Sequence, residues 1–485
     1  MADISFYHGT RVFESNETPV LIRTAQSAVV ALIGTAPDAD PEVFPANRPV
    51  LIRGPHDYNV KVRKLGAAGT LKDAVDGVFD QTGTYCYIIR VPEGASHQET
   101  ISNIVGAREM STGVHALNLC EPLFGNKLKP RLVCVPGLTG GTASDGIASV
   151  SMNNTGGDYY TDNVTARIEG DGVGAELGVL LVDSQIKSIY VKKPGYGYTT
   201  AEVVIEDETG EGAAATAHVG QTASPVVAEL YSILEANRAV AFVDGPDTTD
   251  EEAILYRQMI SSQRIYICDS TVLVRDQTLN VNLPRPASPR FAGVQAKVDR
   301  TLGFHNSVSN KPISGIVGMT RPVMYGTHVN YLNQSGVNTV INDGDGGFLT
   351  YGNRCATSDD LWQFLSVRRI ADFANEAIEA AYREFVDKPF SKANLKFMVE
   401  SGKAFLKLLE AEGYIVPGSS DVWLDGQRNV ATEMVQGRVT LGIKFEPVAP
   451  MEDIRIIAHR NIISYELMLD EVVRELNDGV FAVAA

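Results

Sequence analysis

Strand-like and helix-like segments alternate along much of this chain, and this alternation constrains the fold more than any other feature. Apolar periodicity predicts helices over 71–79, 226–237 and 249–261. Short apolar runs predict buried strands over 85–91, 131–135, 239–243 and 264–268. Strands separated by helices of this size need crossover connections, which are right-handed and build a largely parallel sheet. The sequence therefore predicts an α/β body.

A glycine-rich, acidic segment interrupts this alternation. Residues 141–220 contain 13 of the 44 glycines, together with 12 acidic and 4 basic residues. Their net charge of −8 is nearly half of the −17 carried by the whole chain. Long insertions in a surface loop cost little entropy, so such a segment can extend from a sheet without disturbing it. We expect a small, inserted all-β domain.

A weak internal repeat supports this expectation. Ile147, Gly156 and Tyr159 match Ile186, Gly195 and Tyr198 at a distance of 39 residues. After a slip of one position, Gly172-Val173-Gly174-Ala175 matches Gly210-Glu211-Gly212-Ala213. Self-similarity at a fixed period is typical of repeated structural units. We expect two similar units, each made of strands and glycine turns.

The two ends of the chain have a different pattern. The first 25 residues alternate like a strand, without a hairpin partner, before the first buried strand near 28–34. Ser358-Asp359-Asp360 is expected to cap a long helix, and Ser391 a second helix that stops at Gly413. Strands are predicted over 438–446 and 453–458, followed by a segment with helical potential over 464–477.

Charge and targeting signals exclude several classes of protein. With 42 basic and 59 acidic residues, the chain lacks the basic surface that nucleic acids or anionic membranes require. The first 14 residues have neither the basic nor the apolar region of a signal peptide. The longest apolar runs are much shorter than a membrane span. Neither nucleic-acid binding nor membrane insertion is expected.

Sequence motifs for catalysis and for metal or cofactor binding are missing. There is no GxSxG or GxxxxGK[ST], and the five cysteines and eight histidines show no metal-ligand spacing. Gly170-Asp171-Gly172-Val173-Gly174 is not followed by a helix, unlike a dinucleotide loop. We therefore expect no catalytic residue, no cofactor and no metal. A hydrolase remains an alternative, because a single sequence does not always reveal an active site.

Several short motifs, in order along nearly the whole chain, carry a family resemblance. They are Tyr7-His8-Gly9-Thr10-Arg11-Val12, Phe44-Pro45-Ala46-Asn47-Arg48-Pro49, Lys129-Pro130-Arg131-Leu132, Gly303-Phe304-His305-Asn306, Leu332-Asn333-Gln334-Ser335, Tyr351-Gly352-Asn353-Arg354 and Asp387-Lys388-Pro389. In these motifs the chain resembles the contractile phage tail sheath proteins, including the sheaths of contractile bacteriocins. The glycine-rich segment is the departure from that pattern.

The resemblance implies a structural, non-enzymatic subunit of an α/β (α+β overall) fold. Its expected parts are an N-terminal arm (1–25), an α/β body in two pieces (26–140 and 221–350), the inserted all-β domain (141–220), a tube-proximal C-terminal core (351–460) and a C-terminal extension (461–485). The arm and the C-terminal core together would form an inner core domain. The alternatives are a glycan-binding structural module and an α/β hydrolase.

The resemblance also implies the partners. Subunits would form a helical sleeve of hexameric rings around a tail tube, in contact with baseplate and tail-terminator proteins, and contraction would drive the tube through a bacterial envelope. Neighbouring subunits would exchange terminal strands, for which the candidates are Ile4, Phe6, Thr10, Val12, Glu14, Ile454, Ile456 and Ala458. Candidates for facing the tube are Glu466, Asp470, Glu471 and Glu475. The expected location is the virion, after synthesis in the cytoplasm of a host bacterium.

Overall fold

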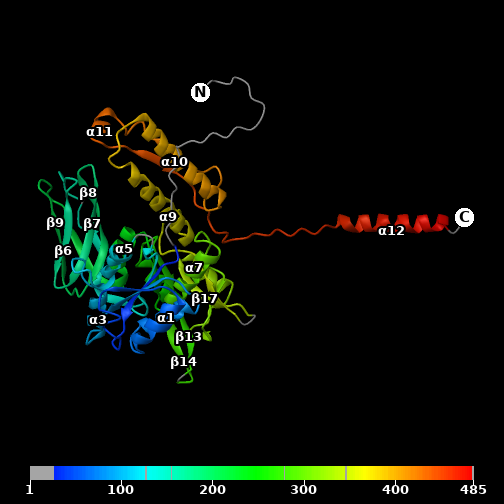
Figure 1. Ribbon diagram of the computed structural model, residues 1–485, viewed down its shortest axis with the longest axis horizontal. Coiled ribbons are helices and arrows are strands. Elements are labelled where there is room, and N and C mark those ends of the chain that lie inside the picture. Colours follow the sequence, from blue (N-terminus) through cyan, green and yellow to red (C-terminus); the bar gives the residue numbers. More distant parts are fainter. Residues whose placement is uncertain (1–26, 126–127, 155, 278, 345–346, 483–485) are drawn as a thin grey trace, which may run out of the picture. The chain divides into compact units, whose positions relative to one another are not determined.

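The computed structural model describes residues 27–125, 128–154, 156–277, 279–344 and 347–482 (Figure 1). The chain divides between Ala449 and Pro450 into two units. The first unit contains nearly all of the secondary structure, and the second contains one long helix.

A nine-stranded sheet is the centre of the first unit. Its strands follow the order β15-β18-β17-β12-β11-β4-β1-β3-β2. Their bounds are β1 Val30–Thr35, β2 Pro49–Ile52, β3 Cys86–Val91, β4 Leu132–Cys134, β11 Val240–Asp244, β12 Ile265–Cys268, β15 Lys311–Pro312, β17 Val337–Asn342 and β18 Phe348–Tyr351. The six strands from β3 to β17 pair in parallel, whereas β2, β18 and β15 pair antiparallel at the margins. The predicted α/β body with a mainly parallel sheet is confirmed.

Helices cover both faces of this sheet, which explains why its central strands are apolar throughout. Every residue of β1 is buried: Val30 and Leu32 face one apolar core, and Ala31 and Ile33 face the other. The first core includes residues of α2 and α7, and the second includes residues of α3, α5 and α6. The helices of this body are α1 Pro55–Lys61, η1 Val62–Leu65, α2 Leu71–Phe79, α3 His97–Val105, η2 Gly113–Leu119, α4 Cys120–Phe124, α5 Pro225–Asn237, α6 Asp250–Gln258, α7 Ser288–Thr301 and α8 Thr327–Gln334.

Between β4 and α5 the chain forms only strands in its described residues. These are β5 Thr142–Met152, β6 Thr165–Gly170, β7 Val173–Val182, β8 Gln185–Tyr196, β9 Ala201–Glu206 and β10 Ala215–Ala223. They pair antiparallel as β5 with β10, β6 with β9, and β7 with β8, and they enclose a small core of their own. We call residues 142–223 the β segment. Thr142 pairs with Ala223, so the segment leaves and re-enters the body at one place.

The two halves of the β segment exchange their tyrosines. The ring of Tyr160 lies against Gly210 of the second half, and its hydroxyl accepts the N–H of Ala213 at 3.1 Å. The ring of Tyr198 lies against Gly172 of the first half, and its hydroxyl accepts the N–H of Ala175 at 3.4 Å. A side chain at either glycine would occupy the space of the ring.

These contacts correct the alignment of the repeat. The partner of Tyr198 is the buried Tyr160, not Tyr159, whose side chain is 73% exposed. Likewise Gly195 (φ 61°) corresponds to Gly157 (φ 65°), because each lies against its own tyrosine ring. The slip therefore occurs before the glycine turn rather than after it. Two adjacent glycines and two adjacent tyrosines made the sequence alignment ambiguous at that point.

The remaining part of the first unit combines two long helices with a small sheet. Its elements are α9 Leu365–Tyr382, η4 Arg383–Phe385, α10 Lys392–Ala411, β19 Asp421–Leu424, α11 Ala431–Val435 and β20 Leu441–Lys444. Ser391 caps α10 as predicted, accepting the N–H of Asn394 at 3.1 Å, and Gly413 follows the helix at φ 79°.

A separate three-stranded sheet contains β14 Val281–Pro286, β13 Thr271–Asp276 and β16 Gly318–Met319.

The predicted start of the first long helix is wrong. Asp359 accepts the N–H of Leu361 at 3.0 Å and so closes a turn, not a helix. The backbone then returns toward the body, with the N–H of Cys355 bonded to Gln363 and that of Leu365 to Asn353. The helix begins only at Leu365.

One face of α9 binds the body through ion pairs. Arg131 immediately precedes β4 and binds Glu376, while Arg264 immediately precedes β12 and binds Asp372 through two nitrogens. The opposite face packs with α10 in a separate apolar core that includes Ile370 and Ala374. The helix is therefore attached to the sheet by charge and to its own neighbours by apolar contact.

The second unit consists of an extended stretch and a helix. Residues 450–461 form neither helix nor strand, and α12 spans Ile463–Ala482, which confirms the helical prediction over 464–477. No helix in the described part of the chain is both long and apolar enough to cross a bilayer.

Candidate functional site

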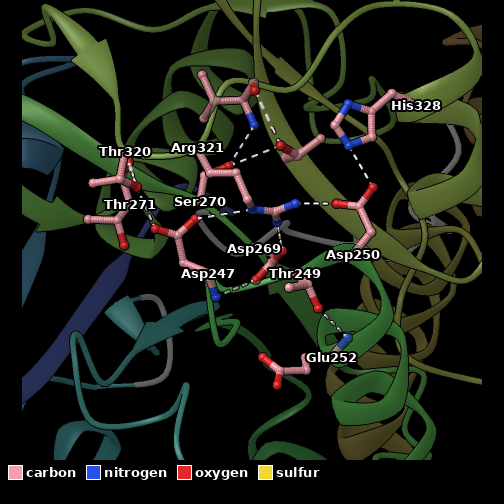
Figure 2. Close-up of polar contacts among 12 residues, drawn as sticks. Asp247, Thr249, Asp250, Glu252, Asp269, Ser270, Thr271, Thr320, Arg321 and His328 are labelled. Carbon is pink, nitrogen blue, oxygen red and sulfur yellow. Dashed lines mark hydrogen bonds and ion pairs between the residues drawn. The ribbon is translucent and has the colours of Figure 1, made fainter.

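The carboxyl ends of parallel strands are where α/β proteins usually bind ligands, and here a charged cluster occupies that position. Arg321 lies between Asp250 at the start of α6 and Asp269 directly after β12, and its guanidinium donates to both carboxylates (Figure 2). Asp247 approaches the Arg321 Nε at 3.8 Å through its Oδ1. His328 Nε2 lies 2.6 Å from Asp250 Oδ2. We call these five residues the Arg321 cluster.

Burial and like charges make Asp269 the most perturbed member of the cluster. Its side chain is fully buried, and burial raises its pKa to about 6 although Arg321 lowers it. Asp247 and Asp250 add to the rise because they are also negative. Asp269 also accepts the N–H of Asp247 at 2.8 Å, which fixes the loop after β11.

The cluster holds a loop in place. Its carboxylates are bound to Arg321, His328, Thr320 and backbone N–H groups, and Asp247 Oδ2 accepts the hydroxyl of Thr320 (Figure 2). Among the described residues, no three His, Cys, Asp or Glu side chains are grouped as a metal site would need. The arrangement connects the ends of β11 and β12 to residues 320–328.

The other expected ligand position of this sheet is filled by the chain itself. Strand order reverses between β1 and β4, which makes the crevice at their carboxyl ends the switch point of the fold. There the Thr70 hydroxyl accepts the N–H of Thr35 at 3.2 Å, and Gly69 lies against the Thr35 carbonyl. The β segment begins a few residues after β4, at the same edge.

The cysteines do not offer a reactive nucleophile. All five are buried. Burial raises the pKa of the Cys120 and Cys355 thiols to about 12. A thiol is nucleophilic only as the thiolate, which burial disfavours.

The small sheet of β19 and β20 has features expected of an assembly site. The two strands pair antiparallel from Asp421–Lys444 to Leu424–Leu441, and in the described residues no third strand joins them. Helix α10 packs on β19, and Trp423 is 42% exposed. A two-stranded sheet is marginal by itself, and its edges present unpaired N–H and C=O groups to a further strand.

The structure describes only some of the predicted strand-exchange residues. Ile4, Phe6, Thr10, Val12 and Glu14 lie outside the described residues. Ile454, Ile456 and Ala458 are exposed in a stretch without hydrogen-bonded strand partners, so the strand predicted over 453–458 is not formed within this chain. A strand requires a neighbour for its ladder, and the described part of the chain provides none for this stretch.

The predicted tube-facing residues lie on α12. Glu466, Asp470, Glu471 and Glu475 are all exposed on this helix. Large apolar side chains are exposed on the same helix at intervals of four, three and four residues, namely Tyr465, Leu469, Val472 and Leu476. The helix is thus amphipathic without an apolar partner in its own unit.

The sequence analysis missed the Arg321 cluster. Asp250 lies in the helix predicted over 249–261, and no sequence motif links it to Asp269 or Arg321. The sequence contains one signal for this site. Asp244 and Asp269 directly follow two predicted strands, and the carboxyl ends of neighbouring parallel strands lie at one edge of a sheet. Nothing in the sequence indicates that residues 320–328 return to that edge.

Comparison with known proteins identifies the class. The model of the phage tail sheath protein central domain matches residues 213–356, and that of the phage tail sheath C-terminal domain matches residues 357–458. Together they cover about half of the chain. The chain belongs to the phage tail sheath family. It is a subunit of a contractile sheath, and these matches do not favour the alternatives of a glycan-binding module or a hydrolase.

Two individual relatives match over nearly the full length, and a third matches over about half of this chain. The tail sheath protein of Escherichia phage P2 is 26% identical over 466 residues, covering 93% of this chain and 94% of that protein. The tail sheath protein of Burkholderia phage BcepMu is 25% identical over 488 residues, covering 92% and 95%. A major tail sheath protein from a Pseudomonas aeruginosa prophage is 35% identical over 240 residues, 48% of this chain and 61% of that protein.

Solved structures share the fold. The contracted helical sheath of the anti-feeding prophage matches with a TM-score of 0.59 at 16% identity, covering 95% of this chain and 100% of that one. The contracted sheath complex of an extracellular contractile injection system, PVC, matches with a TM-score of 0.58 at 14% identity, covering 96% and 100%.

Proposed function

We propose that this subunit forms a helical sleeve of stacked hexameric rings around a tail tube and works mechanically, without catalysis. The observation that carries the proposal is the open sheet of β19 and β20, together with an extended stretch at 450–461 that exposes isoleucine side chains. Main-chain hydrogen bonds to an added strand would give affinity without a dedicated pocket. A contact of this kind, repeated by a screw operation, produces an open helical assembly.

The added strands would come from neighbouring subunits. Residues 453–458 present Ile454 and Ile456 on one side of an extended chain, the period that a sheet face buries. Ile4, Phe6, Thr10, Val12 and Glu14 are the matching candidates in the N-terminal arm. The arm and residues 351–460 would then form the inner core domain of the sleeve.

The acidic face of α12 is proposed to approach the tail tube. It carries Glu466, Asp470, Glu471 and Glu475, so the complementary tube surface would be basic. Baseplate and terminator proteins would contact the two ends of the sleeve. Synthesis would occur in the cytoplasm of the host bacterium, where the five buried cysteines remain reduced.

The β segment is proposed to be an inserted domain on the outside of the sleeve. Its adjacent ends, its own core and its net charge of −8 support a self-contained decoration. The central-domain family model begins only at residue 213, near the end of the segment. We propose no binding activity for it.

A bulky N-terminal fusion tests strand exchange. A folded domain placed before Met1 should block insertion of the arm and abolish tubes in negative-stain micrographs, whereas the same domain joined inside the β segment at the Asp183-Ser184 turn should not. In both fusions the sheath subunit should unfold at the same temperature as in the parent protein. Tubes of normal length from the N-terminal fusion would contradict the proposal.

A further inference from the structure

Two large apolar side chains extend from the loop that the Arg321 cluster holds. Met324 and Tyr325 are 72% and 71% exposed, while the neighbouring Val323 is 4% exposed and belongs to an apolar core with Val329 and Leu332. The Tyr325 ring packs edge-on against Tyr351 with 5.7 Å between the ring centroids, but most of its surface stays exposed. Single exposed apolar residues are ordinary on protein surfaces, whereas two adjacent ones on an anchored loop are less common. Tyr331 on α8 adds a third such side chain at 49%.

The loop is held at both ends and is therefore preorganised. Thr320 donates its hydroxyl to Asp247 and its N–H to Thr271 at 3.0 Å, and Arg321 binds Asp250 and Asp269 (Figure 2). At the other end, His328 binds the same Asp250, so one carboxylate fixes both ends of residues 321–328. Ordering costs for side chains at an interface are smaller when the loop is already fixed.

The loop and the start of α8 carry no acidic or basic side chain beyond the Arg321 cluster. From Pro322 to Tyr331 the sequence contains no Asp, Glu, Lys or Arg. Each copy of the chain carries −17, so copies repel one another over most of their surfaces. A stretch of chain without acidic or basic residues that exposes Met and Tyr is a place where two such copies can approach, and these residue types are enriched in interface cores.

We propose that residues 320–328, displaying Met324 and Tyr325, form a contact between copies of this chain in the sheath. The Arg321 cluster positions this contact, with Asp250 as the residue that fixes both ends of the loop. The contact is separate from the exchanged strands, because it involves side chains on the α/β body rather than backbone at the chain ends. This inference rests on the proposed function, because a contact between copies in the sheath requires that the sleeve forms.

A double variant, Met324→Ser with Tyr325→Ser, tests the contact directly. Both side chains are largely solvent-exposed, and among the described residues the only ring contact removed is that of Tyr325 with Tyr351, so thermal unfolding of the monomer should change little. Tube formation, followed by light scattering and negative stain, should need at least about tenfold more protein, the effect of losing one hot spot. A matched control, Leu180→Ser with Val182→Ser on β7, removes two other exposed apolar side chains and should leave assembly unchanged.

A second variant tests the positioning role. Asp250→Asn keeps Met324 and Tyr325 but weakens the hold on Arg321 and His328, and it should raise the required protein concentration by less than the double variant does. A Met324→Cys variant gives an independent readout, because the five native cysteines are buried. Its labelling should be fast in the monomer and strongly slowed in tubes.

The outcomes separate the two proposals. Tubes from the double variant at the parent concentration, or unchanged labelling of the cysteine in tubes, would overturn the loop contact and leave the sleeve intact. Failure of the parent chain to form tubes would overturn the sleeve, and the loop contact with it.

Discussion

Asp372 on α9 is the residue on which the attachment of the C-terminal helices most depends. It accepts two nitrogens of Arg264, at 2.9 Å for Nη2, and one of Arg368, also at 2.9 Å, and all three side chains are at least nine-tenths buried. Arg368 in turn lies 4.4 Å from the centre of the Trp362 ring. Removing one partner of such a buried group leaves charge without compensation.

Replacing Asp372 with Ala should therefore be costly. We expect a loss of about 3 kcal/mol in the free energy of unfolding, measured by urea denaturation, because in the described part of the chain Arg264 keeps only Glu235 as an ion-pair partner and Arg368 keeps only the neutral Gln263. The control is Glu379→Ala, which removes the more exposed pair with Arg238 and should cost below about 1 kcal/mol. Equal losses for the two variants would show that burial of the pair does not matter.

Asp269 gives the stability a pH dependence of unusual sign. Its pKa in the folded chain, about 6, lies above the ordinary 3.8, so the folded state binds this proton more tightly than the unfolded state. The free energy of unfolding contributed by this group should therefore rise as the pH falls from about 7 to about 4, by up to about 3 kcal/mol.

An Asp269→Asn variant should flatten that part of the profile. Urea denaturation at a series of pH values measures it, with Asp360→Asn at an exposed carboxylate as the control. A parent profile that falls steadily from pH 7 to pH 4, with no difference between parent and Asp269→Asn, would contradict the assignment.

At the scale of elements, the sequence predicts the helices and strands that depend on local pattern. It does not predict the element boundaries that depend on contacts with residues distant in sequence. Helix α2 begins and ends where its apolar spacing predicts, and β11 and β12 lie within a residue or two of prediction, because their buried runs have no other interpretation. The start of α9 was misplaced because Asp359 caps a turn as readily as a helix. Only the return of the chain to Asn353 decides between them.

The Arg321 cluster shows the same limit for the candidate site. Arg321 lies 52 residues from Asp269 and 71 from Asp250 in sequence, and no local pattern joins them. The strand order brings the ends of β11 and β12 together, and the pairing of β16 with β13 brings Arg321 to them.

Only one strand of the open sheet of β19 and β20 is predicted from the sequence. Residues 438–446 alternate clearly, whereas 421–424 is too short to show an alternation.

At the scale of the whole molecule, the β segment should be removable. Joining Gly141 to Ser224 by a short glycine linker should leave the parallel sheet folded, because the segment leaves and re-enters at paired residues. The body would keep a net charge of −9. We expect normal tubes in negative stain with a smaller outer diameter.

One contact of the segment with the body needs a control. Lys193 on β8 lies 3.2 Å from Glu229 on α5, which also binds the buried His115 at 3.0 Å. A Lys193→Ala variant separates loss of this contact from loss of the segment. If the deletion abolishes tubes and Lys193→Ala does not, the segment itself takes part in assembly and its proposed role as decoration is wrong.

The exchanged tyrosines of the β segment have a consequence for its origin. Tyr160 packs against Gly210 and Tyr198 against Gly172, so each half supplies the packing site for the aromatic ring of the other. A polypeptide with one half alone would have no place for its own ring, and could complete its interior only by associating with an identical molecule. The present segment is therefore equivalent to a symmetric dimer joined into one chain, as expected if a gene for a self-pairing unit was duplicated in tandem.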